Sequence, residues 1–228
     1  HGARRVGVRP GTHLIHPLAV TGERPLRFEV VGLPDGLTVD GDGIVRGTAP
    51  AQPGDHELTM AASNELGSIA ESVTLCVGDT LALTPPMGWN SWNVYGSAVS
   101  AEVVLAVAQA MVDTGMRDLG YSYINIDDFW HAAGRAADGR PLANPKTFPD
   151  GMAPVAERVH ELGLKLGIYS DAAELTCGGC YGSLGHEQVD AEAYAEWGVD
   201  LLKYDYCHAP VGRDTAIQRY GAMGGALV

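Results

Sequence analysis

The sequence predicts an α/β chain in which a small all-β sandwich precedes a partial (β/α)8 TIM barrel made of its first four βα units. Up to about residue 79, short alternating apolar segments are separated by the turn sequences PDG, DGDG and QPGD, which is typical of antiparallel strands. After residue 80, apolar strands alternate with helical patterns, and this order predicts parallel strands joined by helices. We therefore expect two domains, 1–79 and 80–228.

Composition narrows the classes of partner. The chain has 228 residues, 46% hydrophobic and 19% charged, which suits one large or two smaller globular domains. A formal charge of -13 argues against nucleic acid or an anionic membrane surface as a partner, because both attract basic patches. No apolar run approaches the roughly 18 residues of a transmembrane helix, and the first residues lack the apolar core of a signal peptide. Since the chain does not begin with Met, we expect a processed chain or a piece of a longer one.

The sequence pattern of residues 1–79 is typical of a β-sandwich. In DHELTMAAS, Leu58, Met60 and Ala62 alternate with more polar neighbours, as in a half-buried strand. The run GLPDGLTVDGDGIVRGTAPAQPGDHELTMAASNELGS resembles the Ig-like modules attached to bacterial secreted enzymes. Such modules are usually spacers, so the resemblance implies no chemistry here, and a carbohydrate-binding role is the alternative. Cys76 is expected to be a lone thiol.

The second region repeats one unit. The helical patterns run from the N-cap Ser100 to Gly115, from Met152 to Gly163, up to Trp197-Gly198, and from about Asp214 onwards. Helices commonly end at a glycine because glycine readily adopts the left-handed backbone conformation. The strands between them are YSYINIDDFW, LKLGIYSD and VDLLKYDYC. Four such units form half a barrel and leave parallel edges unpaired, so we expect the chain to be cut off.

These strands share a carboxylate at their end. Asp127 and Asp128, then Asp171, then Asp205 fall where a (β/α)8 barrel places its active site. The sequence has no G-x-G-x-x-G after the first strand and no Walker motif, so nothing favours a nucleotide-binding sheet.

The stretch LLKYDYCHAP is ambiguous by itself. Because side chains alternate along a strand, Lys203, Asp205 and Cys207 share one face. Lys203 and Asp205 could form a buried structural ion pair, or Asp205 could be a catalytic carboxylate tuned by its lysine neighbour. The stretch alone leaves both readings open.

A longer string of motifs resembles family 27 of the glycoside hydrolases, whose best known members are α-galactosidases. It comprises PMGWNSWN, YINIDDFW, FPDGM, GLKLGIYSD, TCGG, GSLGHE and DAEAYAEWGVDLLKYD with a closing cysteine. The resemblance runs from about Leu83 to the C-terminus.

The resemblance implies a role for each matching residue. Asp205 matches the nucleophile that attacks the anomeric carbon, and Lys203 matches a lysine that hydrogen-bonds the sugar. The remaining matches are Asp127 and Asp128, which grip galactose hydroxyls, Trp92 and Tyr169, which line the pocket, and Cys177 and Cys207, which form a disulfide with Cys177 beside the substrate. Retaining hydrolysis needs an ionised nucleophile and a second carboxyl as acid. The family's acid/base lies on a later strand, so no residue of this chain is assigned to it, and we expect the 228 residues alone to be inefficient.

Several alternatives stay open. Asp127 and Asp128 could hold a divalent metal, and Cys177, Cys180, Cys207 and His208 could bind zinc. Asp171 is expected to be structural, although it could be the missing acid. Phe129 stands where many family members have a cysteine, and Tyr206 is expected to face away from the pocket. Cys180 has no counterpart in the family pattern.

The predicted function is that of a retaining hydrolase that releases terminal α-D-galactose from oligo- or polysaccharides, with no cofactor and no metal. The alternatives are a non-catalytic carbohydrate-binding protein, a β-L-arabinopyranosidase and an α-N-acetylgalactosaminidase. Secretion is inferred from the module type and the implied disulfide, and the oligomeric state is not predicted.

Overall fold

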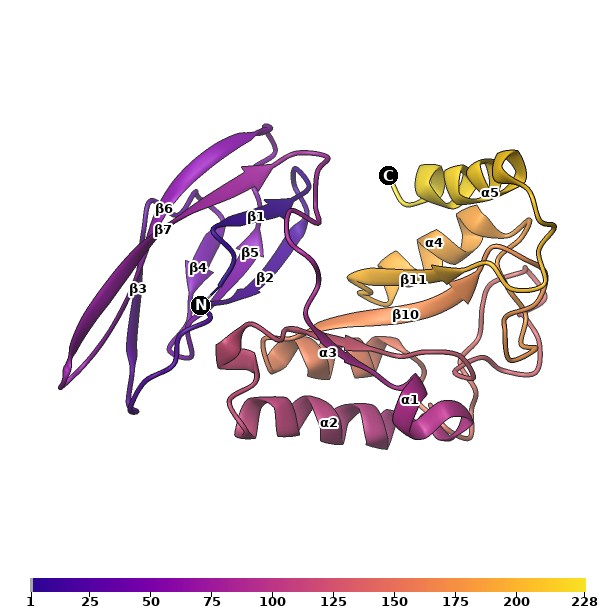
Figure 1. The fold of residues 1–228 in the computed structure, drawn as a ribbon, viewed down its shortest axis with the longest axis horizontal. Helices are drawn as coiled ribbons and strands as arrows, with labels where there is room; N and C mark the ends of the chain where they lie inside the picture. The colour runs from indigo at the N-terminus through magenta and orange to yellow at the C-terminus, as the bar shows by residue number, and fades with distance from the viewer. Residues whose placement is uncertain (1) are drawn as a thin grey trace. The chain divides into compact units, whose positions relative to one another are not determined.

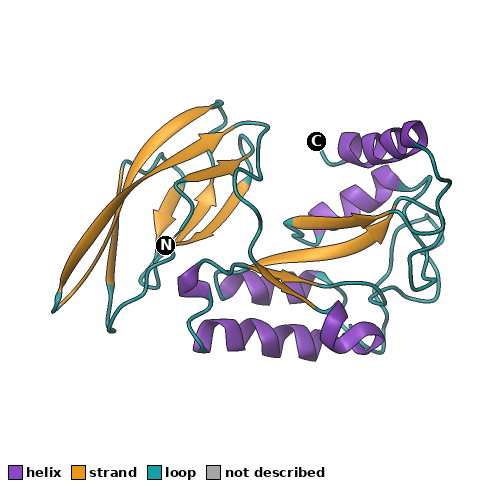
Figure 2. Cartoon of the chain, in the orientation of Figure 1, coloured by secondary structure: helices purple, strands orange, loops and turns teal. Residues whose placement is uncertain are grey.

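A computed structural model describes residues 2–228 of the chain. The chain divides into two compact units. The first comprises the chain up to Gly88 together with Ala110–Ser122, and the second comprises Trp89–Gln109 and Tyr123–Val228. Strands and loops alone make up the described chain before Trp92, and the helices of the described chain begin at or after this residue (Figure 2).

The strands of the first region form two sheets. They are β1 (Arg5–Val8), β2 (His13–Pro17), β3 (Arg27–Val31), β4 (Leu37–Val39), β5 (Ile44–Thr48), β6 (Gly54–Asn64) and β7 (Gly67–Val77). The first sheet has the order β1-β7-β6-β3 and the second the order β2-β5-β4. β6 and β7 form a long antiparallel hairpin that dominates this part of Figure 1.

Both sheets contribute to one hydrophobic core. Leu58 and Leu75 of the first sheet pack with Leu14 and Val45 of the second. The predicted alternation in β6 is confirmed, because Leu58 and Ala62 are buried and Met60 packs against the core. These strands therefore form a two-sheet sandwich, as the alternating pattern predicts.

The remaining elements alternate strand and helix. They are β8 (Gly88–Asn90), α1 (Trp92–Tyr95), α2 (Ala101–Asp113), β9 (Tyr123–Asn125), α3 (Ala153–Glu161), β10 (Lys165–Asp171), α4 (Glu187–Glu196), β11 (Leu201–Asp205) and α5 (Arg213–Ala226), with 3-10 turns at Gly96–Ala98 and Arg117–Leu119. The sheet order is β11-β10-β9-β8, and β10 is parallel to both of its neighbours. The predicted repeat of parallel strands and helices is confirmed for β9, β10 and β11. α3 packs on β10, and α4 and α5 pack on each other (Figure 1).

The predicted helix boundaries have local causes. Ser100 Oγ accepts the backbone N–H of Val103 at 3.3 Å, which satisfies one of the free donors at the start of α2. Gly115, Gly163 and Gly198 have φ values of 77°, 76° and 78°, a conformation that favours glycine. Each of them stops a helix within a few residues of the following strand or turn.

The strand predicted at YSYINIDDFW is shorter than expected. β9 ends at Asn125. The Ile126 N–H still donates to Gly167 O of β10 at 2.9 Å, but the backbone N–H groups after it find partners outside the sheet. Asp127 N–H donates to Ser91 Oγ at 2.9 Å, and Asp128 N–H donates to Asp127 Oδ1 at 2.9 Å. The chain therefore leaves the sheet as it reaches the two aspartates, which places both at the strand end.

Buried apolar side chains support this sheet. Ile124, Ile126, Leu164, Leu166 and Ile168 are each 0% exposed, so β9 and β10 are anchored from below the site. None of the helices within residues 2–228 combines the length and apolarity needed to cross a membrane.

Candidate active site

Three adjacent strands end at one edge of the sheet and carry the predicted site residues. Tyr169 of β10 is the register partner of Lys203 of β11, and Asp171 is the register partner of Asp205. Asp127 follows β9 on the other side of β10. The structure thus brings together residues that are up to 78 positions apart in the sequence, since 205 − 127 = 78.

Lys203 does not form the ion pair with Asp205 that LLKYDYCHAP suggests. Its Nζ lies 2.7 Å from Asp127 Oδ2 and 5.1 Å from the centroid of the Tyr169 ring. Asn90 Nδ2 also donates to Asp127 Oδ2, at 2.8 Å. The alternation along β11 gives the face that Lys203 occupies, but the side chain is long enough to cross β10 and reach the carboxylate beyond it.

Asp128 is held by the loop that carries the TCGG motif. Thr176 Oγ1 donates to Asp128 Oδ1 at 3.0 Å, and the Gly178 N–H donates to Oδ2 at 2.7 Å. The Phe129 N–H also donates to Oδ1, at 2.8 Å. Only glycine fits at 178, because an added Cβ would lie 2.6 Å from the Phe129 ring and 2.7 Å from Asp128 Oδ2.

The oxygens of the two aspartates therefore have separate partners. Asp127 accepts hydrogen bonds from Lys203 and Asn90, and Asp128 accepts them from the loop that carries the TCGG motif. The divalent-metal alternative requires both carboxylates to point at one ion, and the structure instead directs them to different groups.

Asp205 lies at the end of β11 with polar neighbours. Tyr169 Oη donates to Asp205 Oδ2 at 3.4 Å, and the Tyr206 N–H donates to Oδ1 at 3.0 Å. Burial raises the pKa of Tyr169 well above its usual range, so the phenol stays protonated and remains a donor. These two contacts hold the Asp205 carboxylate in place at the end of β11.

Asp171 is buried behind Asp205. Its Oδ2 accepts the backbone N–H of Cys207 at 2.9 Å, while Oδ1 has no partner among residues 2–228. Burial, and secondarily the charge of Asp205, raise the pKa of Asp171. Because Asp171 is 0% exposed, its geometry is that of a residue that fixes the chain after β11.

Cys177 and Cys207 form a disulfide with a Cα–Cα distance of 5.1 Å. The pairing implied by the resemblance is therefore present, and it removes two ligands from the zinc alternative that also used Cys180 and His208. Cys177 Sγ lies 3.2 Å from Tyr169 Oη and 3.5 Å from Asp205 Oδ2. Cys76 and Cys180 are free cysteines.

Two aromatic side chains stack beside the carboxylates. The rings of Trp92 and Phe129 are 6.1 Å apart between centroids and nearly parallel, at 5°. Trp92 is 41% exposed, so one aromatic surface faces solvent, as a stacking platform requires. Tyr206 packs instead on Tyr220, at 5.9 Å between centroids, as the alternation predicts.

Sequence reasoning missed four residues that build the site. They are Asn90, Phe129, Thr176 and Gly178. Asn90 and Gly178 lie inside the motifs PMGWNSWN and TCGG, so the motifs marked the segments but not the contacts. Phe129 adopts a positive φ of 73°, for which its residue type gives no signal.

Comparisons with known proteins agree on one family. Residues 84–228 match the family model described as alpha galactosidase A. Alpha-galactosidase A of Cellvibrio japonicus is 54% identical over 129 residues, covering 57% of this chain and 32% of that protein. The alpha-galactosidase of Cyamopsis tetragonoloba is 50% identical over 149 residues, covering 65% of this chain and 36% of that protein.

A solved structure extends the similarity over both units. The crystal structure of a candidate alpha-galactosidase from Bacteroides fragilis NCTC 9343 matches 98% of this chain with 51% identity and a TM-score of 0.95. The chain covers 48% of that protein, so it spans about half or less of the length of these relatives.

Proposed function

The chain belongs to the alpha galactosidase A family, and on that premise we propose that it provides the nucleophile and the sugar-binding residues of a retaining α-galactosidase. Its substrates are terminal α-D-galactosides of oligo- or polysaccharides. The observation that carries the proposal is the convergence of Asp127, Lys203, Tyr169 and Asp205 at the ends of three neighbouring strands.

In the proposed mechanism, Asp205 attacks the anomeric carbon and forms a glycosyl ester that water later hydrolyses. The protonated Tyr169 hydroxyl orients the attacking carboxylate. Asp127 and Asp128 accept hydrogen bonds from galactose hydroxyls, while Lys203 balances the charge of Asp127 and donates to the sugar. Trp92 offers its exposed ring to the apolar face of the pyranose.

The protonation of the leaving group is a separate step. In the family pattern the acid/base lies on a later strand than β11, so we assign it to no residue described here. General acid catalysis contributes about 10² to 10⁴ in rate. The 228 residues by themselves are therefore expected to bind galactosides but to turn them over poorly.

We further propose that β8–β11 and their helices are the first part of a (β/α)8 barrel occupying residues 80–228. The sandwich of residues 1–79 is proposed to be an Ig-like spacer module. The Cys177–Cys207 disulfide favours an oxidising compartment, and secretion is proposed on that ground.

Chemical rescue of Asp205→Ala in the full-length protein tests the proposal. Removal of the nucleophile should reduce hydrolysis of an aryl α-galactoside by about 10⁴-fold or more, because no covalent intermediate can form. Added azide should restore aryl release and yield galactosyl azide of inverted configuration, since azide fits the space left by the carboxylate. Asp150→Ala, at an exposed position, is the matched control and should retain activity. Retained hydrolysis in Asp205→Ala would exclude Asp205 as the nucleophile.

The choice among sugars has its own test. The proposed grip of Asp127 and Asp128 on hydroxyls around O4 and O6 favours hexoses over pentoses. An aryl α-galactoside should therefore have a higher kcat/KM than the matching β-L-arabinopyranoside, which lacks O6. The N-acetylated α-galactosaminide keeps O4 and O6 and differs at C2, so its kcat/KM tests that alternative separately. Binding of galactose without any turnover in the full-length wild-type protein would instead support a carbohydrate-binding protein.

A further inference from the structure

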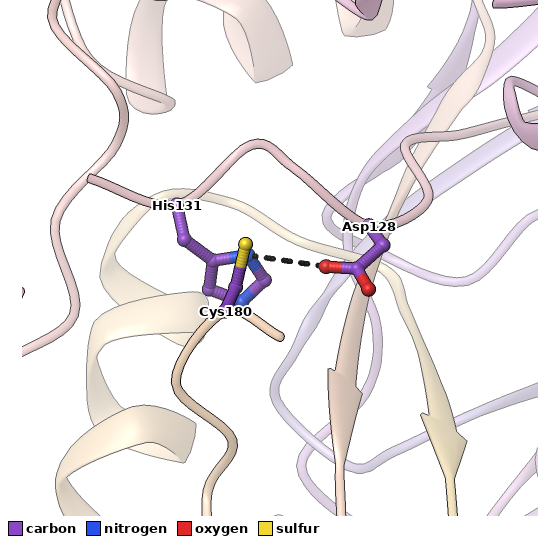
Figure 3. Close-up of side chains that lie close together, drawn as sticks. All are labelled: Asp128, His131 and Cys180. Atoms are coloured by element: carbon purple, nitrogen blue, oxygen red, sulfur yellow. Dashed lines mark ion pairs between the residues drawn. The ribbon is translucent and has the colours of Figure 1, made fainter. Parts of the chain in front are cut away.

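Beside Asp128 lies a cluster of three side chains that the proposed hydrolysis does not use as a set. Asp128, His131 and Cys180 each present one ligand atom, and these atoms lie within 4.8 Å of one another. Figure 3 shows the His131 ring facing the Asp128 carboxylate, with the Cys180 thiol beside the ring. The two ends of the cluster come from separate loops, one after β9 and one after β10.

His131 is the unusual member of this cluster. Its side chain is 1% exposed, yet neither ring nitrogen has a hydrogen-bond partner among residues 2–228. Buried polar groups are nearly always hydrogen-bonded, so an exception of this kind calls for an explanation.

The surroundings fix the ring in this position. It stacks on Trp130 at 4.0 Å between centroids and meets the edge or face of Tyr181 at 4.9 Å. From this position, Nδ1 lies 3.7 Å from Asp128 Oδ1. That separation is too long for a hydrogen bond but suits two ligands of one ion, because tetrahedral zinc with bonds of about 2.0 to 2.3 Å holds its ligand atoms roughly 3.3 to 3.7 Å apart.

We propose that Asp128, His131 and Cys180 form a binding site for a zinc-class divalent ion, with the fourth coordination position open to water. Thiolate, imidazole and carboxylate together are the donor set that zinc accepts, whereas magnesium and calcium select oxygen ligands. Binding replaces the thiol proton of Cys180, which leaves to solvent.

Existing contacts of Asp128 oppose the ion. Asp128 Oδ1 already accepts hydrogen bonds from the Phe129 N–H and from Thr176 Oγ1. The Phe129 bond can remain, but the Thr176 hydroxyl must rotate away for the metal to reach the oxygen. Thr176 Oγ1 still accepts the hydrogen bond from the Cys180 N–H, at 2.9 Å, so the loop that carries the thiol stays anchored.

A consequence follows for the sugar site, and it rests on the proposed function. If Asp128 binds a galactose hydroxyl, an ion on the same carboxylate competes with the substrate. Zinc should then raise KM without changing kcat, and excess chelator should reverse the effect.

Cobalt absorption tests the site without reference to activity. Co²⁺ is added to the intact full-length protein in a buffer without a reducing agent and should give a thiolate-to-cobalt charge-transfer band. One equivalent of Zn²⁺ should displace the Co²⁺ and remove the band. Cys180→Ser should remove the band while keeping the size of the side chain. His131→Phe should weaken Co²⁺ binding by at least tenfold, because it keeps an aromatic ring against Trp130 but lacks both nitrogens.

Cys76→Ser is the matched control, since Cys76 is the other free, half-buried cysteine of the described chain. This variant should keep the full band. A wild-type protein without the band, or a band that survives in Cys180→Ser, would overturn the proposal. A wild-type protein that shows the cobalt band but is not inhibited by Zn²⁺ would instead count against the role of Asp128 in sugar binding, and so against the proposed function alone.

Discussion

Lys203 Nζ lies 2.7 Å from Asp127 Oδ2 and so joins the ends of β11 and β9 across the intervening strand β10. Asp127 is 2% exposed, and a carboxylate at such a position needs a charged or hydrogen-bonding partner. The pair therefore does two things at once: it gives the buried Asp127 carboxylate a charged hydrogen-bond partner, and it fixes the spacing between the ends of β9 and β11.

The Lys203→Met variant should lose both contributions. Hydrogen bonds to charged groups contribute about 1.5 to 3 kcal/mol, so kcat/KM for an aryl α-galactoside should fall by roughly 10- to 100-fold. The loss in unfolding free energy should be smaller, since the lysine side chain is 44% exposed and water screens the pair. Steady-state kinetics and urea denaturation measure the two effects. Lys146→Met, at an exposed position, is the control, and an unchanged kcat/KM in Lys203→Met would contradict the assignment.

Loss of the disulfide should act mainly on stability. Cys177 and Cys207 are separated by 30 positions, and a loop of that length corresponds to about 3 to 4 kcal/mol of denatured-state entropy. Cys177→Ser combined with Cys207→Ser should lower the unfolding free energy by up to that amount, measured by urea denaturation. Cys76→Ser should leave it nearly unchanged. A double variant as stable as the wild type would show that the contacts after β11 hold this loop without the covalent bond.

The contacts of Lys203 and Phe129 could not be predicted from the sequence, whereas the strand ends could. Strand ends and helix stops follow from local patterns, so the carboxylates at 127, 128, 171 and 205 could be placed at one edge of a sheet. Which carboxylate Lys203 reaches depends on the lateral order of the strands and on a flexible side chain, and neither is encoded locally. The positive φ of Phe129 depends on the ring filling the space beside Gly178, a contact 49 positions away along the chain, since 178 − 129 = 49.

The Asp128–His131–Cys180 cluster was missed for a related reason. His131 and Cys180 lie on loops with no periodic pattern, and spacing in the sequence groups Cys177 and Cys180, with Cys207 and His208, as candidate zinc ligands. The structure separates these two cysteines, because Cys177 bonds to Cys207 while Cys180 turns towards His131. A spacing motif cannot distinguish these outcomes without the path of the loop.

Substitution at Gly178 should disturb the predicted sugar site without removing any functional group. The added Cβ of Gly178→Ala would lie within 2.7 Å of both the Phe129 ring and Asp128 Oδ2, so the carboxylate must shift and lose the N–H that it accepts. We expect KM to rise by about tenfold, equivalent to roughly one hydrogen bond, with a smaller change in kcat. Gly134→Ala is the control, because a Cβ there meets no atom within 4 Å. Equal KM values for the two variants would argue that Asp128 does not bind substrate.

The pH dependence of stability should reveal the buried Asp171. Burial raises its pKa in the folded protein above the usual value of 3.8 for an aspartate, so the native state holds this proton at pH values where the unfolded chain has lost it. The contribution of Asp171 to stability is therefore largest below about pH 3.8 and falls as the pH rises through the folded pKa. In Asp171→Asn the amide oxygen can still accept the Cys207 N–H, but no charge develops. The unfolding free energy of this variant relative to wild type should rise between about pH 4 and pH 7, measured by urea denaturation, whereas exposed Asp214→Asn should show no such trend. A parallel pair of curves for wild type and Asp171→Asn would mean that the protein stabilises the ionised form of Asp171 as well as water does.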